Sequence, residues 1–377
     1  MLNLSEKLDE LKQNDCFRTI KNIKEKFSKY IVVDDKKMLN LSSNDYLNLS
    51  TDKDLITEFI EKNLSSNEFL FSSASARLLT GNSACYNELE NNFKKLYKKD
   101  GALLFNTGYQ CNQGVVSTLL DKSDCIISDK LNHASIVSGL KLSPAEHFRY
   151  RHNDTEQLEK ILSEKRNSFK NALIISESVF SMDGDIADIK KLVELKKKYN
   201  CLLMIDEAHA FGVFGDNLTG IAEKLNLLKD IDIITVTLGK SLASLGAVCV
   251  SNKTITDYLI NKASSFIFST AIPSVNVMWT NFLLTEKFEL LKEKSEKLND
   301  LFNYVHKIYP TISASQIIPI ILGDAVKTKN KALELQSKGF YVLPINPPTV
   351  PVGTSRLRLS LNADITKEEV TELFRGL

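Results

Sequence analysis

The chain has 377 residues, of which 43% are hydrophobic and 25% charged, the balance of a globular protein with one large and one smaller domain. Its 48 lysines and arginines match 47 aspartates and glutamates, so the net charge of +1 gives no reason to expect nucleic-acid or membrane-surface partners. No apolar run is long enough for a transmembrane helix, and the acidic, h-region-free start predicts no signal peptide.

The amino-terminal part predicts a small arm. Residues 2–28 carry apolar side chains at helical spacing and should be largely amphipathic helix. Residues 30–33 and 36–42 then predict two short hairpin-like strands. We therefore expect an arm over residues 1–44 that joins the smaller domain.

The middle of the chain alternates between strand and helix patterns. The predicted strands are 102–105, 125–128, 172–176, 202–205, 233–237 and 247–250. The predicted helices are 82–99, one from Asn112, 133–142, 189–199, 221–228 and 254–266. This alternation is typical of an α/β domain with a large, doubly wound, mostly parallel sheet, which we place at residues 45–273.

The carboxyl-terminal part has a different pattern. Residues 274–305 predict one long helix, with room for a kink. Strands are predicted at 317–321, 341–344 and 356–361, with helices at 328–338 and 367–374. Residues 274–377 should therefore form a small α+β domain.

The cysteines indicate the redox state of the compartment, and the histidines indicate whether a metal site is expected. None of the six cysteines is in a C-x-x-C pair, and several lie in or beside apolar runs, as expected of reduced thiols in a cytoplasmic protein. The five histidines are scattered and include no H-E-x-x-H motif, so we expect no metal site.

Lys240 lies between two apolar runs, residues 231–237 and 247–250, at the end of a predicted buried strand. A poorly solvated lysine has a lowered pKa, and its neutral amine can act as a Schiff-base nucleophile. Taken alone, an exposed loop lysine is the commoner interpretation. Other residues decide between the two.

Asp206 ends another predicted buried strand, and His209 follows three residues later. A buried aspartate needs a cationic partner, which a protonated cofactor ring nitrogen would supply. The alternative is that Asp206 caps a helix beginning at Glu207.

Further polar groups follow the ends of other strands. The turn Gly108-Tyr109 presents backbone N–H groups that can bind phosphate, and the hydroxyl of Thr237 could do the same. His133 could lie flat against an aromatic ring, although a structural histidine is the more common case. Ser181 lies in S-M-D-G-D, which alone predicts only a turn. Together, a reactive lysine, an acid for a pyridinium and phosphate donors at one sheet edge predict a pyridoxal 5'-phosphate site.

The motifs that carry a family resemblance are D-E-A-H at 206–209, T-L-G-K at 237–240, S-N-D-Y-L at 43–47, F-S-M-D-G-D at 180–185 and N-H-A-S at 132–135. They resemble those of the α-oxoamine synthases, a family of fold-type I pyridoxal-phosphate enzymes, over nearly the whole chain from about residue 40. The stretch P-P-T-V-P-V-G-T-S-R-L-R-L-S-L at 347–361 is most similar to members that condense L-alanine with a pimeloyl thioester in biotin biosynthesis.

The resemblance implies a role for each matched residue. Lys240 would bind the cofactor covalently and remove the α-proton of alanine, and Asp206 would pair with the ring nitrogen. His133 would stack on the ring, and His209 and Ser181 would contact its phenolic oxygen side. The phosphate end would be held by Gly108, Tyr109, Thr237 and, across a homodimer with shared active sites, by Ser269 and Thr270.

Substrate contacts follow from the same resemblance. Arg358 would bind the carboxylate of the amino acid, with Arg356 on the same strand face as the second choice. Asn44, Thr349 and Arg18 resemble further substrate contacts.

Three alternatives stay open. A sister enzyme such as glycine C-acetyltransferase would share the cofactor site but use other substrates. An aminotransferase would turn over with a keto acid alone. A catalytically inactive binding subunit would show no cofactor linkage. The sequence also leaves open whether the thioester is one of coenzyme A or of an acyl carrier protein.

Overall fold

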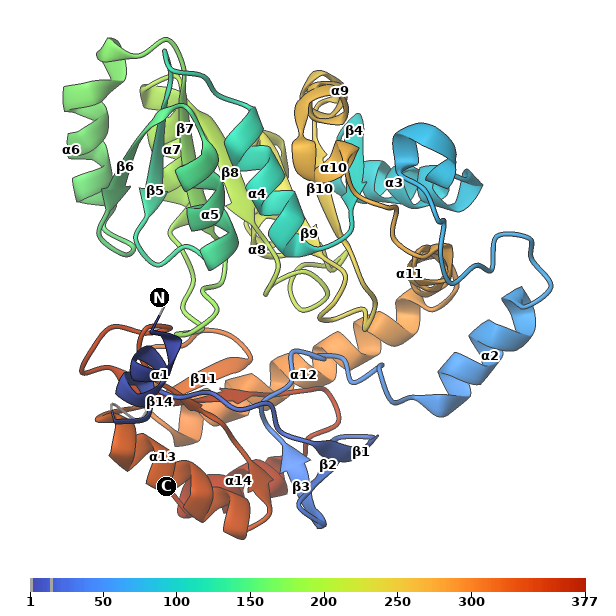
Figure 1. The fold of residues 1–377 in the computed structure, drawn as a ribbon, viewed down its shortest axis with the longest axis vertical. Coiled ribbons are helices and arrows are strands. Elements are labelled where there is room, and N and C mark those ends of the chain that lie inside the picture. Colours follow the sequence, from blue (N-terminus) through green and yellow to red (C-terminus); the bar gives the residue numbers. More distant parts are fainter. Residues whose placement is uncertain (1–2, 14–15) are drawn as a thin grey trace. The chain divides into compact units, whose positions relative to one another are not determined.

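The computed structural model describes residues 3–13 and 16–377, which divide into two compact units (Figure 1). The first unit contains residues 1–52, 181–185 and 297–377, and the second contains residues 53–180 and 186–296. The amino-terminal arm thus shares its unit with the carboxyl-terminal segment. The expected boundary at residue 273 falls before helix α11 (Ser274–Glu286), whereas the second unit continues to Glu296.

A seven-stranded sheet forms the centre of the second unit, in the order β4-β10-β9-β8-β7-β5-β6. The strands are β4 (Gly101–Phe105), β5 (Cys125–Asp129), β6 (Glu146–Tyr150), β7 (Ala172–Glu177), β8 (Leu202–Asp206), β9 (Ile233–Thr237) and β10 (Ala247–Ser251). Only β10 runs antiparallel to its neighbours β4 and β9. The predicted mostly parallel α/β sheet is confirmed.

The helices of the second unit alternate with the strands of this sheet along the chain (Figure 1). They are α2 (Lys53–Asn63), α3 (Ala84–Tyr97), α4 (Gly108–Thr118), α5 (Ala134–Leu142), α6 (Thr155–Lys165), α7 (Ile189–Lys198), α8 (Ile221–Lys224), α9 (Lys253–Lys262), α10 (Ser264–Ile267) and α11. A core of buried side chains, including Ile126, Leu173 and Met204, lies between strands and helices. Burying such a cluster is the main stabilising contribution.

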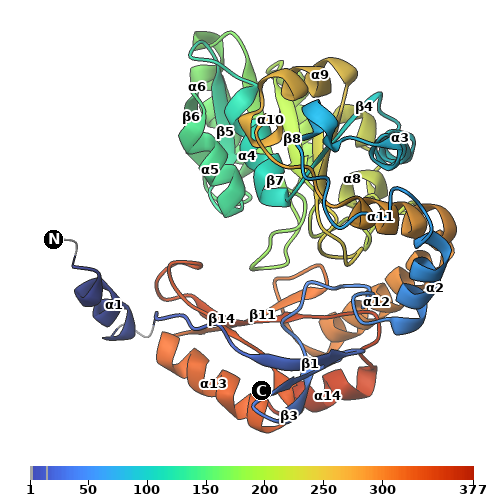
Figure 2. The ribbon, with the colours of Figure 1, turned by 45° about the vertical axis from the view of Figure 1, so that its right-hand side comes forward.

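The first unit holds two smaller sheets (Figure 2). One has the order β1-β2-β3-β12, from β1 (Ile23–Phe27), β2 (Tyr30–Val33), β3 (Lys36–Asn40) and β12 (Phe340–Tyr341). The other has the order β11-β14-β13, from β11 (Ile317–Gly323), β14 (Ser355–Ser360) and β13 (Pro344–Ile345). The helices are α1 (Leu4–Gln13), α13 (Ala325–Ser337) and α14 (Lys367–Arg375), and α12 (Phe288–Ile308) runs across the boundary at 296.

The largest error of the sequence prediction concerns residues 2–28. Helix α1 ends at Gln13, and residues 23–27 form strand β1, paired antiparallel with β2 (residues 1–2 and 14–15 lie outside the described residues). Ser28 has a φ of 47° and turns the chain between the two strands, so the pairing satisfies backbone groups that a helix would have satisfied internally. The predicted helix 274–305 is two helices, α11 and α12, divided at Lys287.

Other differences are smaller. Helix α4 begins four residues earlier than predicted, because the side chain of Thr107 caps it by accepting from the backbone N–H of Gln110. Strand β6 and helices α2 and α6 had no predicted counterpart. None of the helices within residues 3–13 and 16–377 is long and apolar enough to cross a bilayer.

Candidate active site

A cavity of about 180 Å³ lies in the second unit, at the edge of the sheet where the parallel strands end. Its lining includes the end residues Glu177 of β7, Asp206 of β8 and Thr237 of β9. Lys240, His209, His133, Gly108 and Tyr109 line the same cavity. The structure thus brings together seven of the residues singled out from the sequence. This is the edge at which ligands bind in open α/β sheets.

Lys240 follows β9 by three residues and is half-buried. Its Nζ lies 2.8 Å from Nε2 of His209, which is buried in the turn after β8. An amine and an imidazole at hydrogen-bonding distance can exchange a proton, so the pair can serve both nucleophilic and acid–base chemistry.

Asp206 is buried at the end of β8, where parallel pairing sets it beside Glu177 and Thr235. Its Oδ1 accepts a hydrogen bond from the backbone N–H of Ala208 at 2.8 Å. The segment after Asp206 is a turn, so Asp206 does not cap a helix that begins at Glu207. A buried carboxylate that faces a cavity is suited to pair with a cationic ligand atom.

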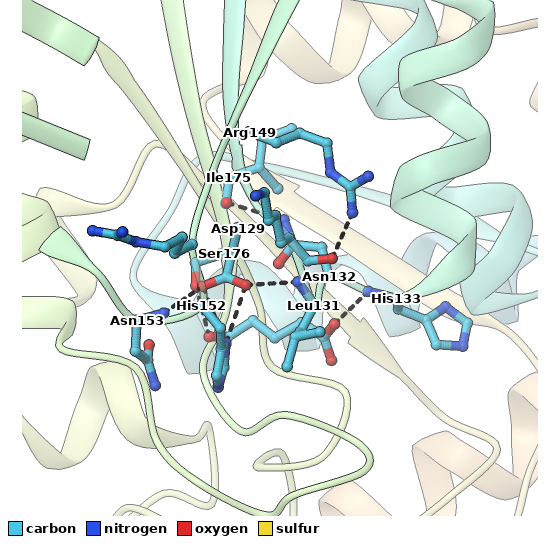
Figure 3. Close-up of polar contacts among 12 residues, drawn as sticks. Asp129, Leu131, Asn132, His133, Arg149, His152, Asn153, Ile175 and Ser176 are labelled. Carbon is cyan, nitrogen blue, oxygen red and sulfur yellow. Dashed lines mark hydrogen bonds and ion pairs between the residues drawn. The ribbon is translucent and has the colours of Figure 1, made fainter. Parts of the chain in front are cut away.

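The loop that carries His133 is held at several points, as Figure 3 shows. The carboxylate of Asp129 accepts from the backbone N–H of Leu131 at 2.7 Å, and Arg149 donates to the carbonyl of Lys130 at 2.6 Å. The side chain of Asn132 donates to the carbonyl of Ile175 at 3.1 Å. The ring of His133 points away from this cluster (Figure 3).

Asp129 also joins this loop to a second one. Its carboxylate lies 3.1 Å from Nδ1 of His152 and accepts from the backbone N–H of Asn153 at 2.8 Å (Figure 3). The side chain of Asp129 is fully buried. Because two loops depend on this one carboxylate, the position of His133 is defined by the sheet edge and not by a flexible turn.

Burial and neighbouring charges shift two pKa values here. The pKa of His133 is lowered, chiefly because protein atoms displace water from part of the ring, with the Lys240 charge adding and the Asp206 charge opposing. The pKa of Glu177 is raised well above its usual range by burial and by the nearby Asp206. Glu177 also accepts a hydrogen bond from the backbone N–H of His133.

The residues predicted for a phosphate lie at and near the start of α4. Gly108 and Tyr109 are its first two residues, so their backbone N–H groups belong to the unpaired first turn. A Cβ added at Gly108 would lie 3.5 Å from the hydroxyl of Thr237. Ser269 accepts from the side chain of Gln110 at 3.3 Å, and the carbonyl of Thr270 accepts from Asn106.

The predicted substrate residues and Ser181 lie in the first unit. Arg358 is buried on β14, and its guanidinium donates to the carbonyl of Ser181 at 2.5 Å and to Oδ1 of Asn44 at 3.2 Å. Both partners are neutral, and no carboxylate among residues 3–13 and 16–377 lies within ion-pair distance of Arg358. Arg356, in contrast, forms a buried ion pair with Asp183. Of the two arginines, Arg356 is thus the one whose charge is balanced by a carboxylate among the described residues.

The remaining predicted substrate contacts, Arg18 and Thr349, touch each other. The guanidinium of Arg18 donates to Oγ1 of Thr349 at 2.8 Å. Sequence reasoning assigned no role to the buried polar residues Glu177, Asn112, Ser135 and Thr235 of the cavity lining, because neither the N-H-A-S motif that ends at Ser135 nor the other strand and helix patterns show which side chains these residues face.

The cavity fits pyridoxal phosphate by the chemistry of its donors. It offers an amine, a buried carboxylate, two imidazoles and the first turn of a helix. Those groups match an aldehyde, a ring nitrogen, an aromatic face and a phosphate. Within the described part of the chain, no group of three or more His, Cys, Asp and Glu side chains could hold a metal ion.

Comparisons with known proteins agree with this chemistry. The family described as "Aminotransferase class I and II" matches residues 36–377. A curated protein of Haemophilus influenzae (strain 86-028NP) named "Putative 8-amino-7-oxononanoate synthase" is 45% identical over 372 residues, 97% of each chain. A protein of the same name from Neisseria meningitidis (strain Z2491) is 44% identical over 372 residues, again 97% of each chain.

Solved structures are similar as well. A serine palmitoyltransferase of S. paucimobilis with bound PLP–myriocin aldimine superposes with a TM-score of 0.87 at 27% identity, covering 99% of this chain and 95% of that one. An 8-amino-7-oxononanoate synthase from Francisella tularensis superposes with a TM-score of 0.74 at 26% identity, covering 90% of this chain and 96% of that one. This chain belongs to the class I and II aminotransferase family of fold-type I pyridoxal-phosphate enzymes and, within it, to the 8-amino-7-oxononanoate synthases of the α-oxoamine synthase group.

Proposed function

We propose that this protein condenses L-alanine with a pimeloyl thioester, with loss of carbon dioxide, to form 8-amino-7-oxononanoate for biotin biosynthesis. The observation that carries the proposal is one cavity that holds Lys240, 2.8 Å from His209, together with the buried carboxylate of Asp206. The sequence identity of 44–45% with relatives that are named for this enzyme supports the choice of substrates.

Pyridoxal phosphate, when bound, withdraws electrons from the α-carbon of the amino acid and so makes its proton removable. Lys240 would hold the cofactor through its amine and, with the amino acid bound in its place, would take the α-proton. Asp206 keeps the ring nitrogen protonated, because a buried carboxylate is stabilised by a cation beside it. The α-carbon would then attack the thioester carbonyl and expel the thiol, and loss of carbon dioxide followed by return of a proton to the same carbon would give the amino-ketone.

The other cavity residues orient the cofactor. His133 would stack on the ring, and His209 and Ser181 are proposed to contact the side that carries the phenolic oxygen. Gly108, Tyr109 and Thr237 bind the phosphate end, where the first turn of α4 offers unpaired N–H groups.

Arg358 binds the carboxylate of alanine. Its guanidinium is buried and donates to the neutral oxygens of Ser181 and Asn44, so a bidentate contact with a carboxylate would supply the negative charge that these partners lack. Asn44, Thr349 and Arg18 are proposed to contact the substrates as well.

The enzyme is proposed to be a cytoplasmic homodimer in which Ser269 and Thr270 reach the phosphate in the partner subunit. Large apolar side chains are exposed close to these residues, namely Phe71 and Leu79 at 79%, Phe268 at 83% and Leu78 at 51%. The segments that bear them are joined, since Ala76 pairs with Thr270 as an isolated bridge. Such an apolar patch is typical of a subunit interface.

The test is a thiol-release assay with purified protein, pyridoxal phosphate, L-alanine and either pimeloyl-CoA or a pimeloyl carrier protein. Parallel arms replace alanine by glycine or serine and the acyl group by acetyl, succinyl or palmitoyl. Alanine-dependent release with a pimeloyl donor is expected, and the preferred donor identifies the carrier. Release only with glycine or serine and another acyl-CoA would reassign the chain to a sister enzyme. Amino transfer to a keto acid without thiol release would make it an aminotransferase.

A further inference from the structure

A chain of side-chain hydrogen bonds runs along the cavity lining from Thr235 to His133. Thr235 donates to Oδ1 of Asn112 at 2.9 Å, and Nδ2 of Asn112 donates to Oδ2 of Asp206 at 2.6 Å and to Oγ of Ser135 at 3.1 Å. The hydroxyl of Ser135 lies 2.7 Å from Nδ1 of His133. Asn112, Ser135, Thr235 and Asp206 are all buried.

The direction of each bond follows from the chemistry of Asp206. A carboxylate offers only acceptors, so the amide nitrogen of Asn112 must face Asp206 and the amide oxygen must face away. The oxygen then lies against Thr235, whose hydroxyl can donate to it. The opposite orientation would set two oxygens against each other in a buried place, which is costly.

The bonds at Ser135 fix the last step. The Ser135 oxygen accepts the second amide hydrogen of Asn112, so its own hydrogen is available for Nδ1 of His133. The backbone N–H of Ser135 also donates to Nδ1, at 3.2 Å. A ring nitrogen that faces two donors is an acceptor and carries no proton, so the proton of the neutral ring lies on Nε2.

We infer that Asn112 is a positioning residue that holds the carboxylate of Asp206 in place and, through Ser135, fixes His133 as the neutral tautomer protonated at Nε2. His133 then meets a bound ligand as a hydrogen-bond donor and not as a base. This inference deepens the proposed function, because the roles of Asp206 and His133 belong to it.

The charged and titratable groups around the ring are compatible with this arrangement. Asp206, Lys240 and Glu177 are the groups that act on it, and the Tyr109 ring lies edge-on with its centroid 6.5 Å away. Glu177 meets the backbone N–H of His133, which leaves the imidazole nitrogens to Ser135 and to the cavity side.

The tautomer can be read directly by NMR of the full-length protein labelled with ¹⁵N-histidine, with and without pyridoxal phosphate. The chain has five histidines, and loss of one set of signals in His133→Gln assigns this one. We expect an unprotonated Nδ1 and a protonated Nε2 in the wild type. In Ser135→Ala and Asn112→Leu, the Nδ1 signal should move toward the average of two exchanging tautomers.

A second readout, cofactor affinity, separates the two branches of the network. One branch runs from Asn112 to Asp206, and the other runs from Asn112 through Ser135 to His133. Asn112→Leu should weaken pyridoxal phosphate binding by about tenfold or more, because Asp206 loses a hydrogen bond to a charged group, whereas Ser135→Ala should change it less than about twofold. Thr235→Val should act on both branches, and Thr235→Ser, which keeps the hydroxyl, should restore both. The matched control is Gln113→Leu on the same helix, whose amide donates to Ser138 outside the network.

A wild-type His133 protonated at Nδ1, or an Asn112→Leu protein with unchanged tautomer and cofactor affinity, would overturn the inference. Both readouts are made without substrate. A failed thiol-release assay would therefore count against the proposed reaction and leave this result standing.

Discussion

Arg356 and Arg358 lie two residues apart on strand β14, yet in the part of the chain that the structure describes only Arg356 pairs with a carboxylate. Asp183 neutralises Arg356 in a buried ion pair, whereas Arg358 is held by the carbonyl of Ser181 and the amide oxygen of Asn44. One arginine is therefore neutralised within the first unit, and the other is the one that we propose binds a ligand carboxylate.

This difference predicts that replacement by methionine affects substrate binding at one arginine and stability at the other. Arg358→Met should raise the KM for alanine by about a hundredfold, because a charged, bidentate contact is lost, with little change in stability. Arg356→Met should lower the free energy of unfolding by about 3 kcal/mol, because it leaves Asp183 buried without its partner. Steady-state kinetics and urea unfolding of both variants test this. Equal effects of the two substitutions on KM would contradict the assignment.

Lys240 is predicted to be indispensable. Lys240→Ala should reduce thiol release by at least about a thousandfold, because it removes both the covalent attachment and the group that takes the α-proton. Borohydride treatment in the presence of pyridoxal phosphate, followed by mass spectrometry, should label the peptide containing residue 240 in the wild type only. Lys253→Ala is the control, since Lys253 is an exposed lysine paired with Asp257. A Lys240→Ala protein with normal turnover would disprove the mechanism.

Much of the second unit was predictable because its strands are short apolar runs and its turns carry motif residues. Lys240, Asp206 and His133 each follow a buried strand of one parallel sheet, so topology alone brings them to a common edge. Asn112 and Glu177 could not be found in this way. Their importance depends on partners far away in the sequence. Asn112 bonds the carboxylate of Asp206, 94 residues on, and Glu177 accepts from the backbone N–H of His133, 44 residues before it.

The amino-terminal arm shows why other elements were missed. Residues 23–27 read I-K-E-K-F, and the preceding leucines suggested that the helix continues. The strand exists because β2 pairs with it, which is a tertiary effect that outweighs local periodicity. In the same way, the ion pair between Asp183 and Arg356 joins residues 173 positions apart and has no signal in the sequence.

The exposed apolar patch around residue 268 predicts that charged substitutions there will prevent dimer formation. Phe268→Asp combined with Leu79→Asp should give a monomer by analytical ultracentrifugation and remove thiol release, because a charge in an apolar interface is costly. Leu142→Asp is the matched control, since Leu142 is 61% exposed and belongs to helix α5. A double variant that stays dimeric and active would place the interface elsewhere.

Glu207 predicts a pH dependence of stability. It is fully buried beside Asp206 and accepts hydrogen bonds from Ser178 and from the backbone N–H groups of Ile221 and Ala222. Burial raises the pKa of Glu207 from 4.5 to about 7. The folded state thus holds a proton that the unfolded state has released between these two pH values, so unfolding becomes easier as pH rises through that window.

The stabilising contribution of protonated Glu207 is complete below pH 4.5 and is lost as pH rises through about 7. The shift corresponds to about 3 kcal/mol. We expect the difference in unfolding free energy between wild type and Glu207→Gln, measured in urea without cofactor, to fall by about that amount from pH 4.5 to 8. The control variant is Glu88→Gln, at an exposed position on α3. A parallel curve for Glu207→Gln would mean that this carboxyl titrates alike in the folded and unfolded chain.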